Sequence, residues 1–220
     1  QSKYRDVSTI AHEMGHAIHK YYTNLNQDYN YSGNAIFVAE IASTVNEILL
    51  NLYMLDNARE KKEKKIIINE MLDDVKNTVY RQTMFAEFEL NIHNMSYNGE
   101  TLTADKLNKI YYDLVKKYHG KDVICDDYIK YEWSRIPHFY SPFYVYQYAT
   151  GFSIAFTIAN KIYNKDKNML KKYIEFLKSG SNDYPTKLVE KMNINIKDSI
   201  DNTLKYFGTL IEKYNDIDKE

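Results

Sequence analysis

Apolar residues recur along this chain of 220 residues at spacings of three and four positions rather than in alternation, which is typical of amphipathic helices. Glycine and proline, with 7 and 3 residues, interrupt the pattern rarely. The pattern therefore predicts an all-α fold in which residues 1–220 form a single helical domain. The helices are expected at 5–24, 37–57, 60–94, 104–119, 144–163, 166–179, 184–192 and 197–215.

Local signals predict where several of these helices begin and end. Thr103 suits the N-cap of a helix, because its hydroxyl can accept a hydrogen bond from an amide of the first turn. An Asn-Gly pair at 98–99 predicts a turn, and the flanking segments 95–97 and 101–102 are expected to pair as a small hairpin. The segment 179–185, which is rich in Ser, Gly, Asn and Asp, predicts a loop between two helices.

The overall composition is that of an ordinary globular protein and excludes some partners. Hydrophobic residues make up 44% of the chain and charged residues 27%, and the formal net charge is -1. This balance gives no electrostatic reason to expect binding to nucleic acid or to an anionic membrane. We also see no apolar run near the ~20 residues that span a bilayer. The single cysteine, Cys125, fits a reducing cytoplasm and is expected to be a small buried thiol rather than a nucleophile.

The pentapeptide His-Glu-Met-Gly-His at residues 12–16 carries the strongest chemical signal in the chain. On a helix, His12 and His16 lie about 40° apart around the axis, so both imidazoles can reach one zinc ion. Glu13 then stands beside the metal, where it can act as a general base on water. The alternative is a chance match on a helix face that points into solvent, and a third ligand at a sensible spacing would argue against it.

A catalytic zinc site needs a third protein ligand, and three residues are candidates. His19 lies about 10 Å along the helix axis from His12, so a structural or supporting role is favoured for it. Metzincins carry Gly and His at the positions of His19 and Tyr22, which excludes that class. On the next expected helix, Glu40 and Glu47 face the same way among apolar residues, where an unpaired carboxylate is costly to bury. The spacing does not choose between these two glutamates.

Five motifs follow one another through most of the chain: His-Glu-Met-Gly-His-Ala from residue 12, Glu-Ile-Ala-Ser-Thr-Val-Asn-Glu from residue 40, Arg-Gln-Thr-Met-Phe-Ala-Glu-Phe-Glu from residue 81, Ile-Pro-His-Phe-Tyr from residue 136 and Phe-Tyr-Val-Tyr-Gln-Tyr-Ala-Thr-Gly from residue 143. Together they resemble the oligoendopeptidase F branch of the thimet oligopeptidase family of zinc metallopeptidases. The resemblance implies one zinc ion per chain, with Glu40 as its third ligand. It also implies that Glu47 orients a ligand histidine.

Peptide hydrolysis develops negative charge on the carbonyl oxygen, which a Tyr hydroxyl or a His N–H can stabilise. The segment from His138 to Tyr148 is the expected source of such donors. On a helix that starts near Tyr144, Tyr144 and Tyr148 share a face while Tyr146 points away. The resemblance implies that His138 and Tyr148 bind the substrate carbonyl and that Tyr144 contacts substrate. Tyr144 and Tyr146 remain alternatives to Tyr148 as the tyrosine that contacts the oxyanion. The alternative to a catalytic role is that these aromatic rings only pack in the core or the cleft.

These inferences predict a zinc-dependent endopeptidase that hydrolyses short oligopeptides. The resemblance implies a mostly helical protein with a deep channel. This chain is expected to be its C-terminal catalytic part, because a cleft needs walls and the metal helix begins within the first ten residues. The expected partners are short peptides and a missing N-terminal lobe of the same protein. The alternative is a non-catalytic helical module that binds a peptide or another partner and carries a vestigial zinc site.

Overall fold

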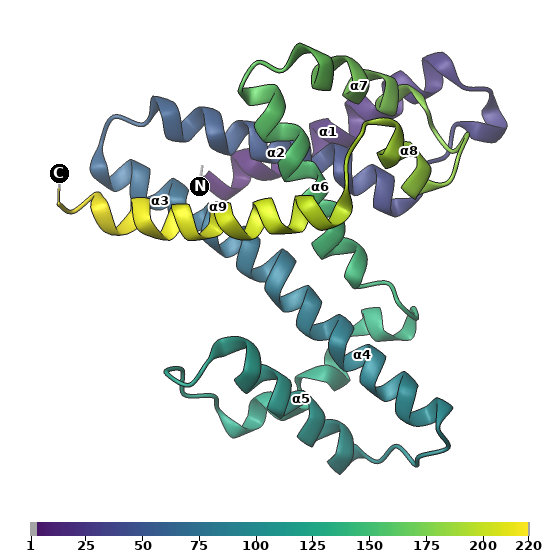
Figure 1. Ribbon diagram of the computed structural model, residues 1–220, viewed down its shortest axis with the longest axis vertical. Coiled ribbons are helices and arrows are strands. Elements are labelled where there is room, and N and C mark those ends of the chain that lie inside the picture. Colours follow the sequence, from purple (N-terminus) through teal and green to yellow (C-terminus); the bar gives the residue numbers. More distant parts are fainter. Residues whose placement is uncertain (1–3, 220) are drawn as a thin grey trace. The chain divides into compact units, whose positions relative to one another are not determined.

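The structure is a computed structural model that describes residues 4–219. Within these residues every regular element is helical and no strand occurs (Figure 1), which confirms the all-α prediction. The α-helices are α1 (Tyr4–Asn26), α2 (Ile36–Asn57), α3 (Lys61–Val75), α4 (Arg81–Tyr97), α5 (Ala104–His119), α6 (Tyr146–Tyr163), α7 (Lys167–Lys178), α8 (Pro185–Lys191) and α9 (Ile196–Asp216). The shorter helical elements are η1 (Tyr29–Tyr31), η2 (Lys76–Tyr80), η3 (Asp127–Arg135) and η4 (Pro137–Tyr140).

Most expected helix boundaries agree with the structure to within a few residues, but the single helix expected at 60–94 is wrong, because the π-helical turn η2 separates α3 from α4. A π-helical turn keeps the apolar spacing nearly helical, so the pattern does not signal it. Two local predictions differ in outcome. The predicted hairpin is wrong, because α4 continues to Tyr97 and the Asn-Gly pair ends that helix. Gly99 adopts a φ of 77°, the left-handed conformation that closes many helix C-termini. The predicted N-cap is confirmed, because the Thr103 hydroxyl accepts from the Lys106 amide at 3.4 Å.

The described residues group into two compact units. The first unit holds the residues up to Val75 and those from Thr150 onward, and the second holds Lys76–Ala149. The boundary at Val75 coincides with the π-helical turn η2, which lies between α3 and α4. This grouping does not test the prediction of a single domain, which stays a prediction.

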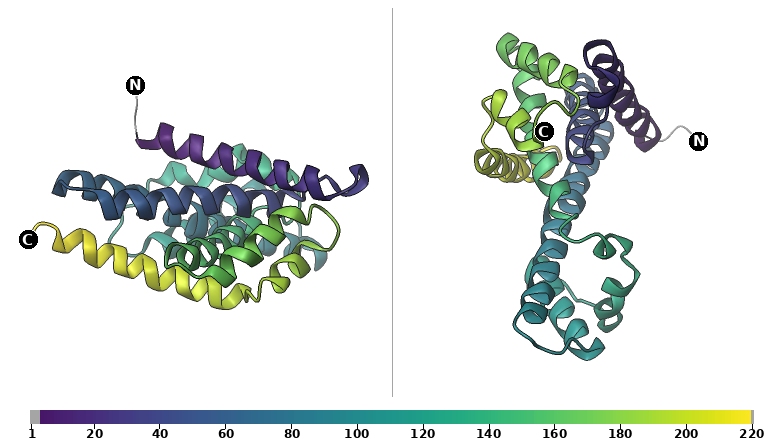
Figure 2. Two further views of the ribbon diagram at one scale, coloured as in Figure 1. Left: turned by 90° about the horizontal axis from the view of Figure 1, so that it is seen from above. Right: turned by 90° about the vertical axis from the view of Figure 1, so that its right-hand side faces the viewer.

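In the first unit α1 lies lengthwise along α2, and α9 packs against α3 (Figure 2). Helix α2 has a wide apolar face that packs against neighbouring helices. Its residues Val38, Ile41, Ala42 and Val45 are at most 1% exposed. Burial of such side chains stabilises a fold by roughly 1.5–3 kcal/mol each. The α1–α2 pair is therefore a rigid base for side chains that project from it.

By length and composition alone, helix α2 could cross a membrane. Within residues 4–219 it is the one helix that is both long enough and apolar enough to do so. Half of its most apolar stretch is buried inside the protein, and core helices pass the same test. The prediction that the protein has no membrane partner therefore stays a prediction.

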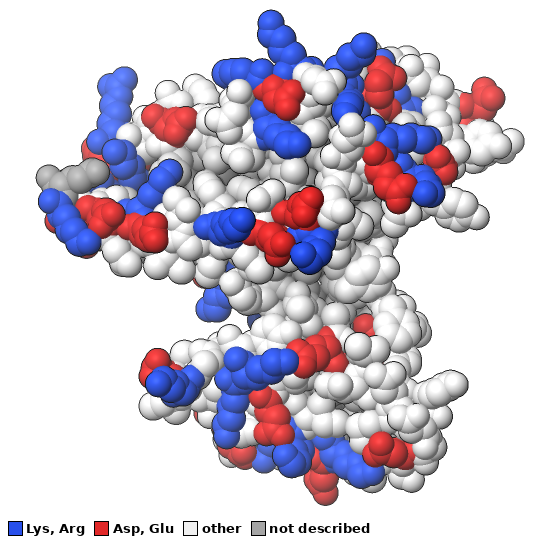
Figure 3. Space-filling model, viewed as in Figure 1, with Lys and Arg blue, Asp and Glu red and all other residues white. Residues whose placement is uncertain are grey.

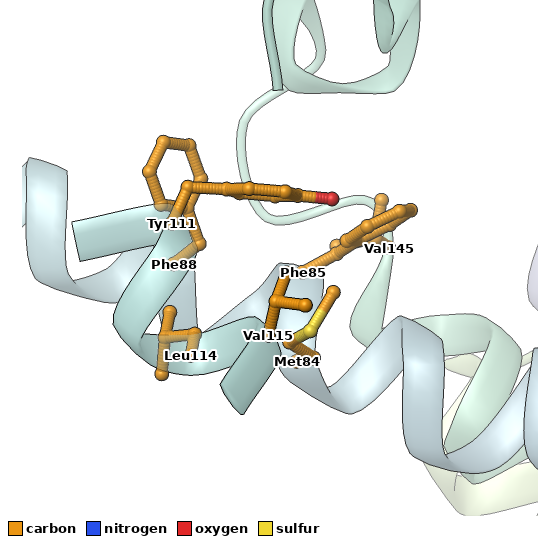
Figure 4. Packing of buried hydrophobic residues seen from close by; sticks show 7 residues of the cluster. All are labelled: Met84, Phe85, Phe88, Tyr111, Leu114, Val115 and Val145. Carbon is orange, nitrogen blue, oxygen red and sulfur yellow. The ribbon is translucent and has the colours of Figure 1, made fainter. Parts of the chain in front are cut away.

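The second unit has a core of its own between α4 and α5 (Figure 4). Tyr111 is fully buried, and its hydroxyl donates to Oε2 of Glu132 at 2.6 Å. Burial, together with this carboxylate, raises the pKa of Tyr111 well above its usual range. Glu132 also pairs with Arg81 and Arg135, so its charge is compensated. The core cluster consists of Met84, Phe85, Phe88, Tyr111, Leu114, Val115 and Val145.

Charged side chains of both signs intermingle on the face shown in Figure 3. Ion pairs between neighbouring residues on one helix bring opposite charges together, as in Lys178–Glu175 of α7 and Lys187–Glu190 of α8. The visible surface thus offers no extended field of one sign that would attract a polyanion.

Candidate active site

Gly15 allows α1 and α2 to approach one another closely. A Cβ atom added at Gly15 would lie 2.5 Å from Cα of Ser43 and 2.9 Å from the carbonyl oxygen of Ala42. Both are backbone atoms, so any side chain at this position would force the two helices apart. The side-chain amide of Asn46 adds a hydrogen bond to the carbonyl of Ala11 at 3.3 Å. The close approach brings the pentapeptide of α1 against the first half of α2.

The side chains of His12, His16 and Glu40 converge at this contact. One ligand atom from each lies within 4.8 Å of the corresponding atoms of the other two. Nε2 of His12 is 3.6 Å from Oε2 of Glu40, and the two imidazole rings meet edge to face with centroids 4.9 Å apart. All three residues are partly buried. Among residues 4–219 this is the one group of three or more His, Cys, Asp or Glu side chains that could hold a metal ion.

Glu47 lies on the other side of the His12 ring. Its Oε2 is 3.3 Å from Nδ1 of His12, and its Oε1 accepts from the hydroxyl of Ser8 at 2.6 Å. The hydrogen bond that Glu47 accepts from Nδ1 raises the pKa of His12, against the opposing effect of burial. A proton held on Nδ1 leaves the lone pair of Nε2 directed toward Glu40. Ser8 was not predicted, although its position four residues before His12 on the same helix face was a usable signal.

The arrangement separates the two glutamates that the spacing left equivalent. Glu40 lies beside Nε2 of His12, whereas Glu47 lies beside the opposite nitrogen, Nδ1. The hydroxyl of Ser43 lies 3.4 Å from Oε2 of Glu40 and helps to orient this carboxylate. These positions agree with the roles that the family resemblance implies for both residues, and the roles themselves stay predictions.

His19 lies away from the donor group. It is 1% exposed and stacks on Phe176 of α7, with ring centroids 6.0 Å apart. Burial lowers its pKa to about 4, so the ring is neutral at physiological pH. Its Nε2 atom is buried and has no hydrogen-bond partner within residues 4–219. The structure therefore gives His19 a packing position, as the sequence favoured.

Glu13 follows His12 on α1, and its side chain is exposed. It does not belong to the group of three converging residues. Its charge is close enough to contribute to the raised pKa of His12. A carboxylate that is near the donor group but not part of it is free to accept a proton.

A second polar network lies deeper between α1, α2 and α3. The hydroxyl of Tyr4 donates to Oδ1 of Asn51 at 2.5 Å, and the amide of Asn51 points to Oδ2 of Asp74 at 3.5 Å. Burial raises the pKa of Asp74 to about 7, with further contributions from Glu47 and Glu70. Asp74 is thus partly protonated near neutral pH, which reduces the negative charge that faces Glu47.

The predicted substrate-binding residues form a separate cluster in the second unit. The rings of His138 and Tyr144 stack with centroids 5.6 Å apart and an interplanar angle of 3°. The hydroxyl of Tyr148 lies 3.2 Å from that of Tyr144 and 3.4 Å from Nε2 of His138. Tyr146, the other open alternative, is half exposed. We call His138, Tyr144 and Tyr148 the aromatic triad.

An all-helical fold that gathers two histidines four residues apart with a glutamate from the next helix is typical of metallopeptidases with the His-Glu-x-x-His motif. The chain belongs to peptidase family M3, whose family model matches residues 2–207.

Individual relatives agree with this assignment. The chain is 46% identical to oligopeptidase PepF of Bacillus subtilis (strain 168), over 87% of this chain and 28% of that protein. It is 41% identical to the chromosomal oligoendopeptidase F of Lactococcus lactis subsp. cremoris, over 97% of this chain and 35% of that protein. The crystal structure of oligoendopeptidase-F from Enterococcus faecium superposes with a TM-score of 0.88 at 39% identity, covering 98% of this chain and 40% of that one. The chain thus spans well under half the length of these relatives.

Proposed function

We propose that the complete protein is a zinc-dependent endopeptidase that hydrolyses short peptides. The observation that carries this proposal is the convergence of His12, His16 and Glu40. Family membership supports peptidase activity, and the relatives named oligopeptidase and oligoendopeptidase support short peptides as the substrate class. A full set of three donors favours an enzyme over a helical module with a vestigial site.

The three converging residues fit zinc in both chemistry and spacing. Two imidazole nitrogens and one carboxylate form a recurring donor set of catalytic zinc sites, which keep one position open. Ligands about 2.1 Å from a tetrahedral ion are about 3.4 Å from one another, close to the 3.6 Å between His12 and Glu40. A bound zinc ion would act as a Lewis acid that polarises the peptide carbonyl and makes water more acidic.

Glu13 is the general base in this proposal. Its carboxylate accepts a proton from the attacking water and later delivers that proton to the leaving amine. The exposed position of Glu13 next to His12 supports this role, because the side chain can reach a substrate from solvent. Glu47 holds His12 in the tautomer that leaves Nε2 free for the metal.

His138 and Tyr148 stabilise the developing oxyanion, and Tyr144 contacts the substrate. The contacts inside the aromatic triad support these roles, because each polar group of the triad is held near the next. An N–H or O–H donor that is already oriented before the reaction stabilises the transition state by about 3 kcal/mol. Tyr144 supports the ring of His138 by stacking on it.

The proposed partner besides the substrate is the rest of the longer protein. Helix α1 exposes an apolar stripe, whose members are 37–65% exposed, on the side opposite the ligand histidines. An apolar face of this length is usually covered in a folded protein. The additional length of the relatives supplies the chain that would cover it. The stripe consists of Val7, Ile10, Met14, Ile18, Tyr21 and Leu25.

The stripe can be tested with one substitution in two contexts. In the complete protein, Leu25→Lys is expected to lower the free energy of unfolding by about 2 kcal/mol, because a charge enters a covered apolar surface. In the chain of 220 residues alone it should have little effect on unfolding. Asn24→Lys, on the neighbouring exposed position, is the control for both contexts. An equal response of the two substitutions in the complete protein would contradict the proposal, and dissociation of an oligomer by Leu25→Lys would assign the stripe to a second copy instead.

We also propose a cytoplasmic location without nucleic-acid partners. The single cysteine, Cys125, supports a reducing compartment because it can form no disulfide within the chain. It is partly buried rather than fully buried. The mixed surface charge supports the absence of polyanionic partners.

The direct test of the proposed function is hydrolysis of quenched fluorogenic peptides of graded length by the complete protein. Short peptides are expected to be cleaved internally, and a folded protein substrate is expected to resist. Removal of metal with a chelator should abolish turnover, and stoichiometric zinc should restore it. A metal-free protein that cleaves peptides at the original rate would refute the proposal.

A further inference from the structure

One residue beside the aromatic triad adopts an uncommon backbone conformation. Phe143 directly precedes Tyr144 and has a φ of 56°, in the left-handed region that a bulky side chain rarely occupies. Such a conformation persists only where surrounding contacts enforce it, and it is concentrated at functional sites. The contacts of Phe143 therefore decide how the chain enters Tyr144.

Two residues of α4 hold Phe143 in place. Oε1 of Glu89 accepts the backbone N–H of Phe143 at 2.6 Å, a short charge-assisted hydrogen bond. Glu89 is only 2% exposed, so its carboxyl group needs a hydrogen-bond partner inside the protein, and the N–H of Phe143 supplies one. One helical turn further along, the ring of His93 packs on the ring of Phe143 with centroids 4.7 Å apart. Glu89 ends the motif at 81–89, to which the mechanism assigns no role.

On its other side Tyr144 is fixed by Val145. Val145 is fully buried and belongs to the core cluster of the second unit, with Phe85 and Tyr111 (Figure 4). Tyr144 thus stands between two anchored neighbours, one held by a hydrogen bond and one by packing. This double anchoring sets the direction of the Tyr144 ring, which stacks on His138.

We propose that Glu89 is a positioning residue for catalysis, because its bond to Phe143 keeps the turn that aligns the aromatic triad. The inference rests on the proposed function of the triad. Glu89 does not touch substrate and acts only through Phe143 and Tyr144. Loss of its acceptor oxygen releases the turn, and a displacement of the triad by about 1 Å is enough to lower turnover strongly.

The test uses kinetic constants of the complete protein with short fluorogenic peptides. Glu89→Leu removes the acceptor and is expected to lower kcat about tenfold or more, with KM within about threefold of wild type. Glu89→Gln keeps an acceptor oxygen in the same place and should retain most of kcat. Glu87→Gln is the matched control, because it removes a nearby carboxylate of α4 that accepts from the exposed Lys117 and the partly buried Tyr118 rather than from Phe143. Its kcat should equal that of wild type.

A double-mutant cycle with Tyr148→Phe identifies the route of the effect. In the Tyr148→Phe protein, Glu89→Leu should lower kcat little further, because both substitutions impair the same aromatic triad. The inference would be overturned if the fold-changes in kcat of the two substitutions multiplied in the double mutant. It would also be overturned by a wild-type kcat for a folded Glu89→Leu protein. If the Glu89→Leu protein does not fold, Glu89→Asp takes its place, because it shortens the side chain by one methylene and moves the acceptor oxygen away from Phe143. A lowered kcat is then expected, and a wild-type kcat would overturn the inference. A wild-type kcat for Tyr148→Phe would remove the triad from catalysis and this inference with it, whereas the proposed peptidase function would survive.

Discussion

The substitution Glu13→Gln is expected to lower kcat for peptide hydrolysis by about 10³-fold or more while leaving zinc bound at one ion per chain. Glutamine preserves the size of the side chain but cannot accept the proton that water must lose. The three converging donors are untouched, because Glu13 is not one of them. Zinc content by elemental analysis and kcat with fluorogenic peptides, both on the complete protein, measure the two parts of this result.

The control for this prediction is Glu212→Gln, which removes an exposed glutamate of α9. It should leave both zinc content and kcat at their wild-type values. Normal turnover by Glu13→Gln protein would show that another group takes the proton. Loss of zinc from the same protein would instead show that Glu13 is a ligand.

Glu40→Gln and Glu47→Gln are expected to differ sharply in zinc affinity. Glu40 presents its carboxylate beside Nε2 of His12, so Glu40→Gln replaces an anionic donor by a weaker neutral amide oxygen and removes the charge that offsets the ion. Glu47 only orients His12 through Nδ1, and loss of such a partner lowers metal affinity about 10–100-fold. The Glu40→Gln protein should therefore be largely zinc-free at free zinc concentrations that still saturate the Glu47→Gln protein.

Competition with a chromophoric chelator measures both affinities under the same conditions. Ser8→Ala provides a graded comparison, because it removes one hydrogen bond from Glu47 and leaves the carboxylate in place. Its affinity should fall between those of wild type and Glu47→Gln. The reverse order, with Glu47→Gln the weaker binder, would exchange the roles of the two glutamates.

Most of the fold was predictable from the sequence because its signals are local. The spacing of apolar residues and the scarcity of Gly and Pro determine the helices directly. The hairpin prediction was wrong for a local reason as well. An Asn-Gly pair can end a helix or form a hairpin turn, because both structures need a residue with positive φ, which Gly99 provides. The 3₁₀ segments η3 and η4 were missed because such short turns carry no periodic signal.

The candidate site was predictable only in part, because it depends on contacts between distant segments. The pentapeptide and the two glutamates are visible in the sequence, but their spacing does not distinguish Glu40 from Glu47. The family resemblance implied different roles for them, and the packing of α1 on α2 places them on opposite nitrogens of His12. That packing depends on Gly15, whose role is invisible without the backbone of Ser43 beside it. Glu89 was equally hidden, because its partner lies 54 residues away in sequence.

Zinc-edge anomalous diffraction from crystals of the complete protein, purified without chelators, shows whether His12, His16 and Glu40 hold zinc. We expect one zinc ion per chain, at about 2.0–2.2 Å from Nε2 of His12, a ring nitrogen of His16 and a carboxylate oxygen of Glu40. The absence of zinc from folded protein, or zinc held by Glu47 in place of Glu40, would contradict this expectation.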